Sequence, residues 1–125
     1  MLAYLIVALG SAIGGALRHG TNVAGARLLG TGWPYGTLTV NIVGSFAIGA
    51  IVAYFATHGH GGQRWLLFLA TGLVGGFTTF SAFSLDVVLL YERGRLVQAA
   101  LYLVASVALS IAALVVALML IRRTG

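Results

Sequence analysis

The sequence predicts an all-α integral membrane protein in which four spanning helices form one domain. Of its 125 residues, 60% are hydrophobic and only 7% are charged, and a water-soluble domain of this size cannot bury so much apolar surface. A helix needs about 20 apolar residues to cross the hydrocarbon core of a bilayer. Four runs of sufficient length can be read, at about residues 2–29, 36–57, 65–91 and 96–121.

The segments between the runs have the composition of tight turns at a water interface. Residues 30–34, 58–64 and 92–95 are rich in glycine and charged or polar side chains, which favours short connections. Aromatic rings that anchor to lipid headgroups stand at the predicted span ends: Trp33, Tyr35, Trp65 and Tyr91. No basic segment precedes the first run, so we expect it to stay as a span and not to be cleaved as a signal.

The third run contains an interruption where an ordinary span would carry leucine and valine. Residues 75–83 read GGFTTFSAF, a run of glycine and hydroxyl residues. Lipid provides no partner for free backbone N–H and C=O groups, so irregular backbone persists at membrane depth only where protein buries it or a wet cavity adjoins it. We therefore expect a broken third helix near the midplane, and a transport site beside it.

The arginines of the predicted loops and termini divide equally between the two sides of the membrane. One side holds Arg64, Arg122 and Arg123, and the other holds Arg27, Arg93 and Arg95. Because Lys/Arg bias in short loops sets orientation, this tie predicts insertion in both directions. An antiparallel, dual-topology homodimer has its two-fold axis in the membrane plane, so the two broken helices could cover each other.

Two predicted spans carry polar residues at every fourth position. Thr37, Asn41 and Ser45 share one face of the second span, and the fourth span repeats the spacing with Tyr102, Ser106 and Ser110. Such side chains often bond between helices or to their own backbone, but two aligned stripes favour a lined pathway. The amide of Asn41 brings two N–H donors that suit an anion, with an interhelical hydrogen bond as the alternative.

Two phenylalanines and one pair of opposite charges are further candidates. Phe80 and Phe83 are three residues apart, so their rings project from similar sides of the half-helix after the break, and ring edges carry the positive end of the aromatic quadrupole. The alternative is that both rings face lipid or the core. Arg18 and Asp86 lie inside spans, where we expect them to pair or to face a vestibule.

Several other functions fit poorly. The chain has no paired carboxylates, no nucleophile beside a base and no phosphate loop, so we do not expect an enzyme, and its scattered arginines argue against nucleic-acid binding. The alternative is a small dual-topology, proton-coupled cation or drug antiporter. Such a carrier needs a carboxylate within the membrane, for which Asp86 is the candidate. A membrane scaffold would have no use for paired polar stripes.

Three segments resemble the Fluc (CrcB) fluoride channels: GGALR at residues 14–18, GTLTVNIVGSF at residues 36–46 and GGFTTFSAFS at residues 75–84. The resemblance covers the first three spans and extends to the four-span length. It implies a passive fluoride-selective channel in the cell membrane of a prokaryote, exporting fluoride through two pores of an antiparallel homodimer. Nothing in the sequence supplies a nucleotide site or an obvious proton relay, which agrees with passive transport.

The resemblance also assigns individual roles. It implies that Asn41, Phe80 and Phe83 line the pore, and that a structural sodium ion lies at the dimer centre, held by the backbone carbonyls of Gly75 and Thr78. A further set of hydroxyl groups completes the expected fluoride path: Ser110, Thr79, Ser81 and Thr37. Some positions depart from the commonest family pattern, namely His19, Ala82 and Leu114.

Overall fold

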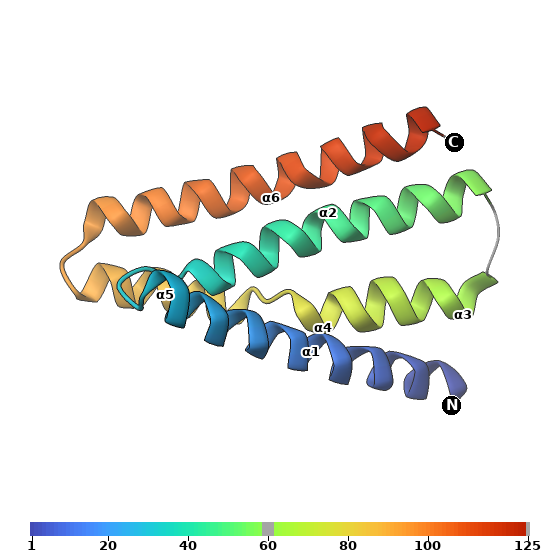
Figure 1. Cartoon of the computed structure of the whole chain (residues 1–125), viewed down its shortest axis with the longest axis horizontal. Helices are drawn as coiled ribbons and strands as arrows, with labels where there is room; N and C mark the ends of the chain where they lie inside the picture. The colour runs from blue at the N-terminus through green and yellow to red at the C-terminus, as the bar shows by residue number, and fades with distance from the viewer. Residues whose placement is uncertain (59–61, 125) are drawn as a thin grey trace.

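The computed structural model describes residues 1–58 and 62–124 and is helical almost throughout. Figure 1 shows the order of the helical segments. These are α1 (Leu2–Leu29), α2 (Tyr35–His58), α3 (Gly62–Leu66), the π-helix η1 (Leu67–Val74), α4 (Gly75–Phe77), α5 (Ser81–Glu92) and α6 (Leu96–Thr124). Four stretches are long and apolar enough to cross a membrane: Leu2–Leu29, Tyr35–Thr57, Gly62–Glu92 and Leu96–Arg123.

The prediction of four apolar spans is thereby confirmed. The third consists of α3, η1, α4 and α5 in succession, and it begins at Gly62 where the sequence suggested a start near residue 65. Of the second predicted connection, residues 59–61 lie outside the described part of the chain. The α1–α2 and α5–α6 turns lie together at one end of the bundle, and both termini lie at the other (Figure 1).

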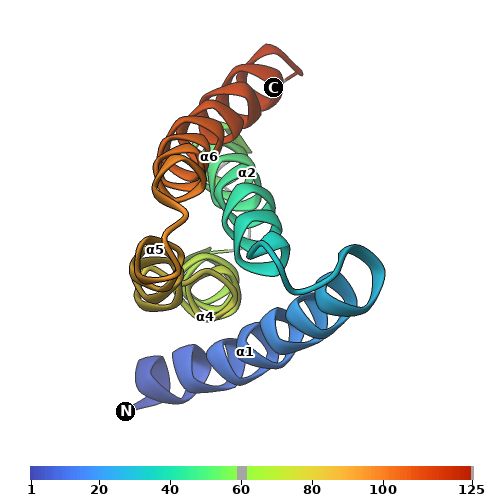
Figure 2. The same ribbon diagram turned by 90° about the vertical axis from the view of Figure 1, so that its left-hand side faces the viewer.

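α2 packs along α6, and α1 packs against η1 and α4. α1 and α2 also pack against each other, which joins these two sets of helices. Viewed along the bundle, α4 and α5 lie between α1 on one side and α6 on the other (Figure 2). The buried cluster of Phe83, Leu90, Ala99 and Tyr102 joins α5 to α6. Many large apolar side chains point outward, such as Leu9 and Val104, as expected for a surface that lipid covers.

The third span is interrupted, as the sequence predicts. α4 ends at Phe77, Thr78 is extended with φ −82° and ψ 160°, and α5 starts at Ser81. The eight residues before α4 form the π-helix η1, which was not predicted from the sequence. π-Helical turns are rare and frequently occur at functional sites, and this one leads directly into the break.

Close backbone contact fixes the broken span against α1. A Cβ atom added to Gly14 would meet the carbonyl oxygen of Leu73, and it would lie 2.7 Å from the amide nitrogen of Phe77. On the facing segment, a Cβ atom at Gly76 would lie 2.6 Å from the carbonyl oxygen of Ser11. Small residues allow helices in membranes to approach in this way, so α1 forms a wall behind the break.

Candidate functional site

The side chain of Asn41 holds the backbone at the break. Its Nδ2 donates to the carbonyl oxygen of Thr79 at 3.0 Å, and its Oδ1 accepts from the amide of Thr79, also at 3.0 Å. The N–H and the C=O of Thr79 are thus both hydrogen-bonded by the carboxamide of Asn41, as a neighbouring β-strand would bond them. One of the two N–H donors of Nδ2 is not used in this pair, so Asn41 has both a structural contact and a donor to spare.

Other polar groups replace the helical hydrogen bonds that the break removes. Arg18 donates from Nε to the carbonyl oxygen of Gly76 at 3.3 Å. The Oγ1 of Thr79 accepts from the amide of Ala82 at 3.1 Å, which caps the first turn of α5. The Oγ1 of Thr78 adds a second bond, at 3.1 Å, to the carbonyl oxygen of Val74, which still accepts from the Thr78 amide at 2.9 Å. The break is therefore a fixed element, held from α1, α2 and α5.

Two carbonyl oxygens at the break have lost the amides that a continuous helix would give them. The helical partner of the Gly75 oxygen is the Thr79 amide, which donates to Asn41. The helical partner of the Thr78 oxygen is the Ala82 amide, which donates to the Thr79 hydroxyl. Gly75 is exposed and Thr78 is partly exposed. Neutral carbonyl oxygens of this kind are suitable ligands for a hard monovalent cation.

A cavity of about 300 Å³ lies beside the break, between α2, α5 and α6. We call it the central cavity. It brings together five of the residues predicted to line a fluoride path: Asn41, Thr79, Phe80, Phe83 and Ser110. Gly75 and Thr78, the predicted sodium ligands, line it as well.

Two buried hydroxyl groups of the central cavity have no protein partner. Among the described residues, the Oγ atoms of Ser106 and Ser110 are buried without a hydrogen bond, and both residues line the cavity. A buried hydroxyl without a partner costs about 1–3 kcal/mol, so such groups call for an explanation. Both are O–H donors one helical turn apart on α6, and Ser106 also lies close to the Tyr102 hydroxyl. An anion or water in the cavity would satisfy Ser110 and could also accept from Ser106.

Aromatic rings run from the central cavity toward the end of the bundle. The ring centroids of Phe80 and Phe83 are 5.5 Å apart, and those of Phe83 and Tyr102 are 5.3 Å apart. The Trp33 ring stands edge-on to Tyr102 at 5.4 Å. Phe83 is 5% exposed, whereas Phe80 is 77% exposed. Phe83 is therefore part of the core of this chain, and Phe80 projects from it.

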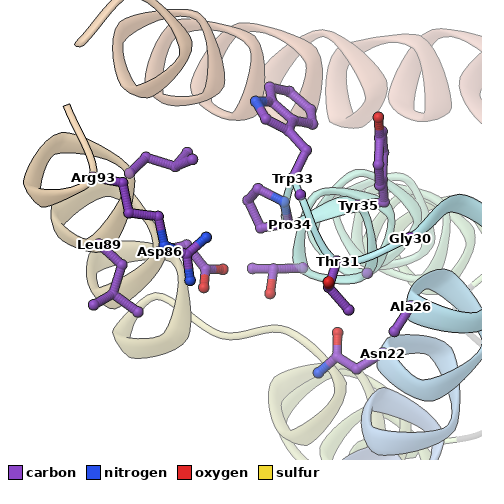
Figure 3. A pocket seen from close by; sticks show the side chains of 14 residues that line it. Asn22, Ala26, Gly30, Thr31, Trp33, Pro34, Tyr35, Asp86, Leu89 and Arg93 are labelled. Carbon is purple, nitrogen blue, oxygen red and sulfur yellow. The ribbon is translucent and has the colours of Figure 1, made fainter. Parts of the chain in front are cut away.

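A second pocket, of about 210 Å³, opens at the end of the bundle that carries the two turns. We call it the end pocket. Asn22, Thr31, Asp86 and Arg93 extend into it from different helices and turns (Figure 3). The hydroxyl of Tyr102 donates to Oδ2 of Asp86 at 3.1 Å. Tyr102 thus touches Phe83 of the central cavity with its ring and Asp86 of the end pocket with its hydroxyl.

Some predicted site residues lie elsewhere than expected. Thr37 is buried and lines the end pocket, not the central cavity. Ser81 lines neither cavity, although its Oγ lies 3.3 Å from the Thr79 hydroxyl. Arg18 and Asp86 were expected to pair or to face a vestibule. Arg18 donates to the Gly76 carbonyl, whereas Asp86 accepts from Tyr102 and lines the end pocket.

Asn22 is a site residue that was not predicted from the sequence. It lies in α1, lines the end pocket, and its side-chain oxygen lies directly against Gly36 of α2. The signal was available, because an asparagine within an apolar run is costly unless it faces protein or water. Ser106 was predicted only as part of the polar stripe on the fourth span. Its position in the central cavity depends on how α6 packs against α2 and α5.

The chain matches known proteins over nearly its whole length. The model of the family described as CrcB-like protein, Camphor Resistance (CrcB), matches residues 5–118. A protein of Granulibacter bethesdensis named fluoride-specific ion channel FluC is 56% identical over 122 residues, which cover 98% of this chain and 96% of that protein. Two proteins of the same name are each 52% identical. The alignment with the protein of Methylobacterium nodulans covers 100% of both chains. The alignment with the protein of Rhodopseudomonas palustris covers 97% of this chain and 98% of that protein.

Proposed function

Since the chain belongs to the CrcB-like family, and relatives 52–56% identical over nearly their full length are named fluoride-specific ion channels, we propose that it is a fluoride-selective ion channel. It is a multi-pass protein of the prokaryotic cell membrane, with four apolar spans. Transport is passive, down the electrochemical gradient of fluoride, and the benefit is export of the ion from the cell.

One observation within the molecule supports this function above the others. The hydroxyl groups of Ser106 and Ser110 are buried without a protein partner in the cavity that also holds Asn41. Fluoride is a small, strongly hydrogen-bonding anion, and these groups donate hydrogen bonds. Among the residues that the structure describes, no arginine or lysine lines the central cavity, so none of them would hold an anion there as a fixed counter-charge and prevent its release.

The magnitudes indicate how an ion would cross. Drying a small ion fully costs on the order of 20 kcal/mol, and each hydrogen bond to a charged group returns about 1.5–3 kcal/mol. Ser106, Ser110 and the free Asn41 donor together recover only about 4.5–9 kcal/mol. The ion therefore keeps part of its water, and the dry stretch is short. The edges of the Phe80 and Phe83 rings supply weak positive contacts along that stretch.

The functional unit that we propose is an antiparallel homodimer with two pores. The exposed oxygens at the break and the 77% exposed ring of Phe80 would otherwise face lipid, which cannot satisfy backbone groups. A second, inverted copy would cover both breaks at once. The ends of the bundle carry Arg27, Arg93 and Arg95 on one side and Arg64, Arg122 and Arg123 on the other, a balance that supports dual topology.

Within this dimer we propose a structural Na⁺ at the break. The carbonyl oxygens of Gly75 and Thr78 would hold it, because the amides that would pair with them in a helix donate to other groups. Bound there, the cation would supply positive charge to the helix ends of both copies.

A flux assay tests the function directly. Purified protein is reconstituted into liposomes loaded with potassium fluoride, valinomycin is added, and a fluoride electrode follows the efflux, with potassium chloride liposomes measured in parallel. We expect rapid fluoride loss and little chloride loss, without any requirement for a pH gradient. Absence of fluoride efflux from liposomes that contain folded protein would remove the channel assignment. Flux that appears only with a pH gradient would favour the proton-coupled antiporter and Asp86.

A further inference from the structure

A third pocket lies at the same end of the bundle as the end pocket, on the side where α1 ends and α6 begins. We call it the side pocket. It has a volume of about 520 Å³. Its polar wall consists of Arg95, Gln98 and the backbone of Gly32, and its apolar wall consists of Leu29, Leu101 and the rings of Trp33 and Tyr35. The proposed fluoride path uses neither wall.

The guanidinium of Arg95 is held in place over this pocket. Its Nη1 donates to the carbonyl oxygen of Gly32 at 3.0 Å and to Oε1 of Gln98 at 3.4 Å. The first bond links the α5–α6 turn to the α1–α2 turn. Both bonds use Nη1, and the guanidinium has five N–H donors, so Nε and Nη2 retain donors for another ligand.

The charge of Arg95 is not balanced within the side pocket. The chain has only two acidic residues, Asp86 and Glu92, and neither lines this pocket. A guanidinium with free donors matches the geometry of a phosphate, which it can bind through two parallel N–H···O bonds. The polar wall is thus complementary to an anionic phosphate group.

The apolar wall has the composition of a membrane interface. Leu29 is 60% exposed and Leu101 is 59% exposed, and they flank the pocket from α1 and α6. The rings of Trp33 and Tyr35, with centroids 5.5 Å apart, lie where both helices of the α1–α2 turn end, the depth at which such rings meet headgroups. An occupant would therefore place a phosphate at Arg95 and a hydrocarbon chain along Leu101.

We infer that the side pocket binds one anionic phospholipid, with its phosphate on Arg95 and Gln98 and an acyl chain along Leu29 and Leu101. Because Arg95 also ties the two turns together, an occupied pocket would stabilise that end of the bundle. The site is separate from the central cavity, so this inference does not depend on the identity of the transported ion. It depends only on the membrane location of the chain.

Quenching of Trp33 by a brominated lipid tests the site. The full chain has two tryptophans, so Trp65→Phe leaves Trp33 as the only one. Phosphatidylglycerol with brominated acyl chains is titrated into the protein in detergent micelles, and brominated phosphatidylcholine serves as the neutral comparison. We expect saturable quenching by phosphatidylglycerol at concentrations at least several-fold lower than for phosphatidylcholine. Equal quenching by the two lipids would overturn the inference.

Two arginines of one turn provide a matched pair of variants. Arg95→Gln should weaken phosphatidylglycerol binding by about fivefold, which is the factor for roughly 1 kcal/mol per basic residue at an anionic surface. Arg93→Gln removes the same charge two residues away, from the end pocket, and should leave binding unchanged. Equal weakening in both variants would show diffuse attraction without a site, and no weakening in Arg95→Gln would also overturn the inference.

Lipid binding by Leu101→Gln and competition with soluble glycerol phosphate test the acyl-chain position and the need for a lipid. Leu101→Gln leaves the Arg95–Gly32 bond intact and makes the apolar wall polar, so it should weaken lipid binding even if Arg95→Gln fails to fold. Unchanged binding in Leu101→Gln would refute the acyl-chain position. Soluble glycerol phosphate at millimolar concentration should not displace the lipid. Displacement by it would show a phosphate site that does not require a lipid.

Discussion

The carboxamide of Asn41 in α2 pairs with both backbone polar groups of Thr79, at 3.0 Å in each direction. A single side chain therefore replaces two of the hydrogen bonds that the third span loses at its break. The same side chain lines the central cavity. The shape of the break and the lining of the proposed path consequently depend on one residue, and its variants should affect both.

Asn41→Asp should reduce fluoride efflux by about 10- to 100-fold. The change places a carboxylate oxygen where Nδ2 now donates to the Thr79 carbonyl, so two oxygens would face each other at 3.0 Å. It also adds negative charge to an anion path. A lost bond to a charged group is worth about 1.5–3 kcal/mol, and 1.4 kcal/mol corresponds to tenfold. The electrode assay measures it, and undiminished efflux would remove Asn41 from the path.

Ser110→Ala should change efflux and stability in different directions. The Ser110 hydroxyl is buried without a partner, so its removal should leave thermal stability unchanged or slightly higher. Efflux should fall about tenfold because one donor to the ion is lost. Ser110→Thr keeps the hydroxyl and should retain most of the flux. A variant that loses stability while its flux is normal would show that the hydroxyl has a structural role only.

The four spans could be predicted because lipid imposes a simple requirement. Every backbone group at membrane depth needs an internal partner, so apolar run length nearly determines the helices, and the first run at residues 2–29 matches α1 (Leu2–Leu29). The break in the third span could also be predicted, because residues 75–83 (GGFTTFSAF) are rich in glycine and hydroxyl residues. The π-helix η1 (Leu67–Val74) could not be predicted, because no periodicity in LFLATGLV separates one bonding pattern from the other.

The site was predicted in part, for reasons of geometry. Asn41 and Ser110 were found because polar residues in an apolar run are conspicuous, and both line the central cavity. Thr37 shares the helix face of Asn41 but lies four residues away, about 6 Å along the axis. There it reaches the end pocket, beyond the buried ring of Tyr102. A stripe on one helix does not show where a neighbouring helix closes a cavity.

Phe80→Ile should impair fluoride efflux several-fold without unfolding the chain. The Phe80 ring is 77% exposed, so this chain makes little use of it for packing. Phe83→Ile is the comparison, because that ring is 5% exposed and contacts Tyr102 at a centroid distance of 5.3 Å. We expect Phe83→Ile to lose stability as well as flux, measured by thermal denaturation beside the electrode assay. Normal conduction by Phe80→Ile would refute the ring-edge contact.

Gly14→Ala should destabilise the protein by about 1–3 kcal/mol, the usual cost of forcing a methyl group into a packed interior. The new Cβ would meet the Leu73 carbonyl oxygen and would lie 2.7 Å from the Phe77 amide nitrogen. Both are backbone atoms, so relief requires α1 to move away from the broken span. Such a movement would also lengthen the 3.3 Å bond from Arg18 to Gly76, so fluoride efflux should fall together with stability.

Gly15→Ala is the matched control for that change. The residue is adjacent in the same helix, and the nearest atom to its added Cβ is a side-chain nitrogen of Arg18 at 4.0 Å, which is ordinary van der Waals contact. Alanine favours a helix over glycine by up to about 1 kcal/mol, so Gly15→Ala should be neutral or slightly stabilising. Thermal denaturation of both variants measures the difference. Equal stability of the two would show that α1 does not need backbone contact at Gly14 to support the break.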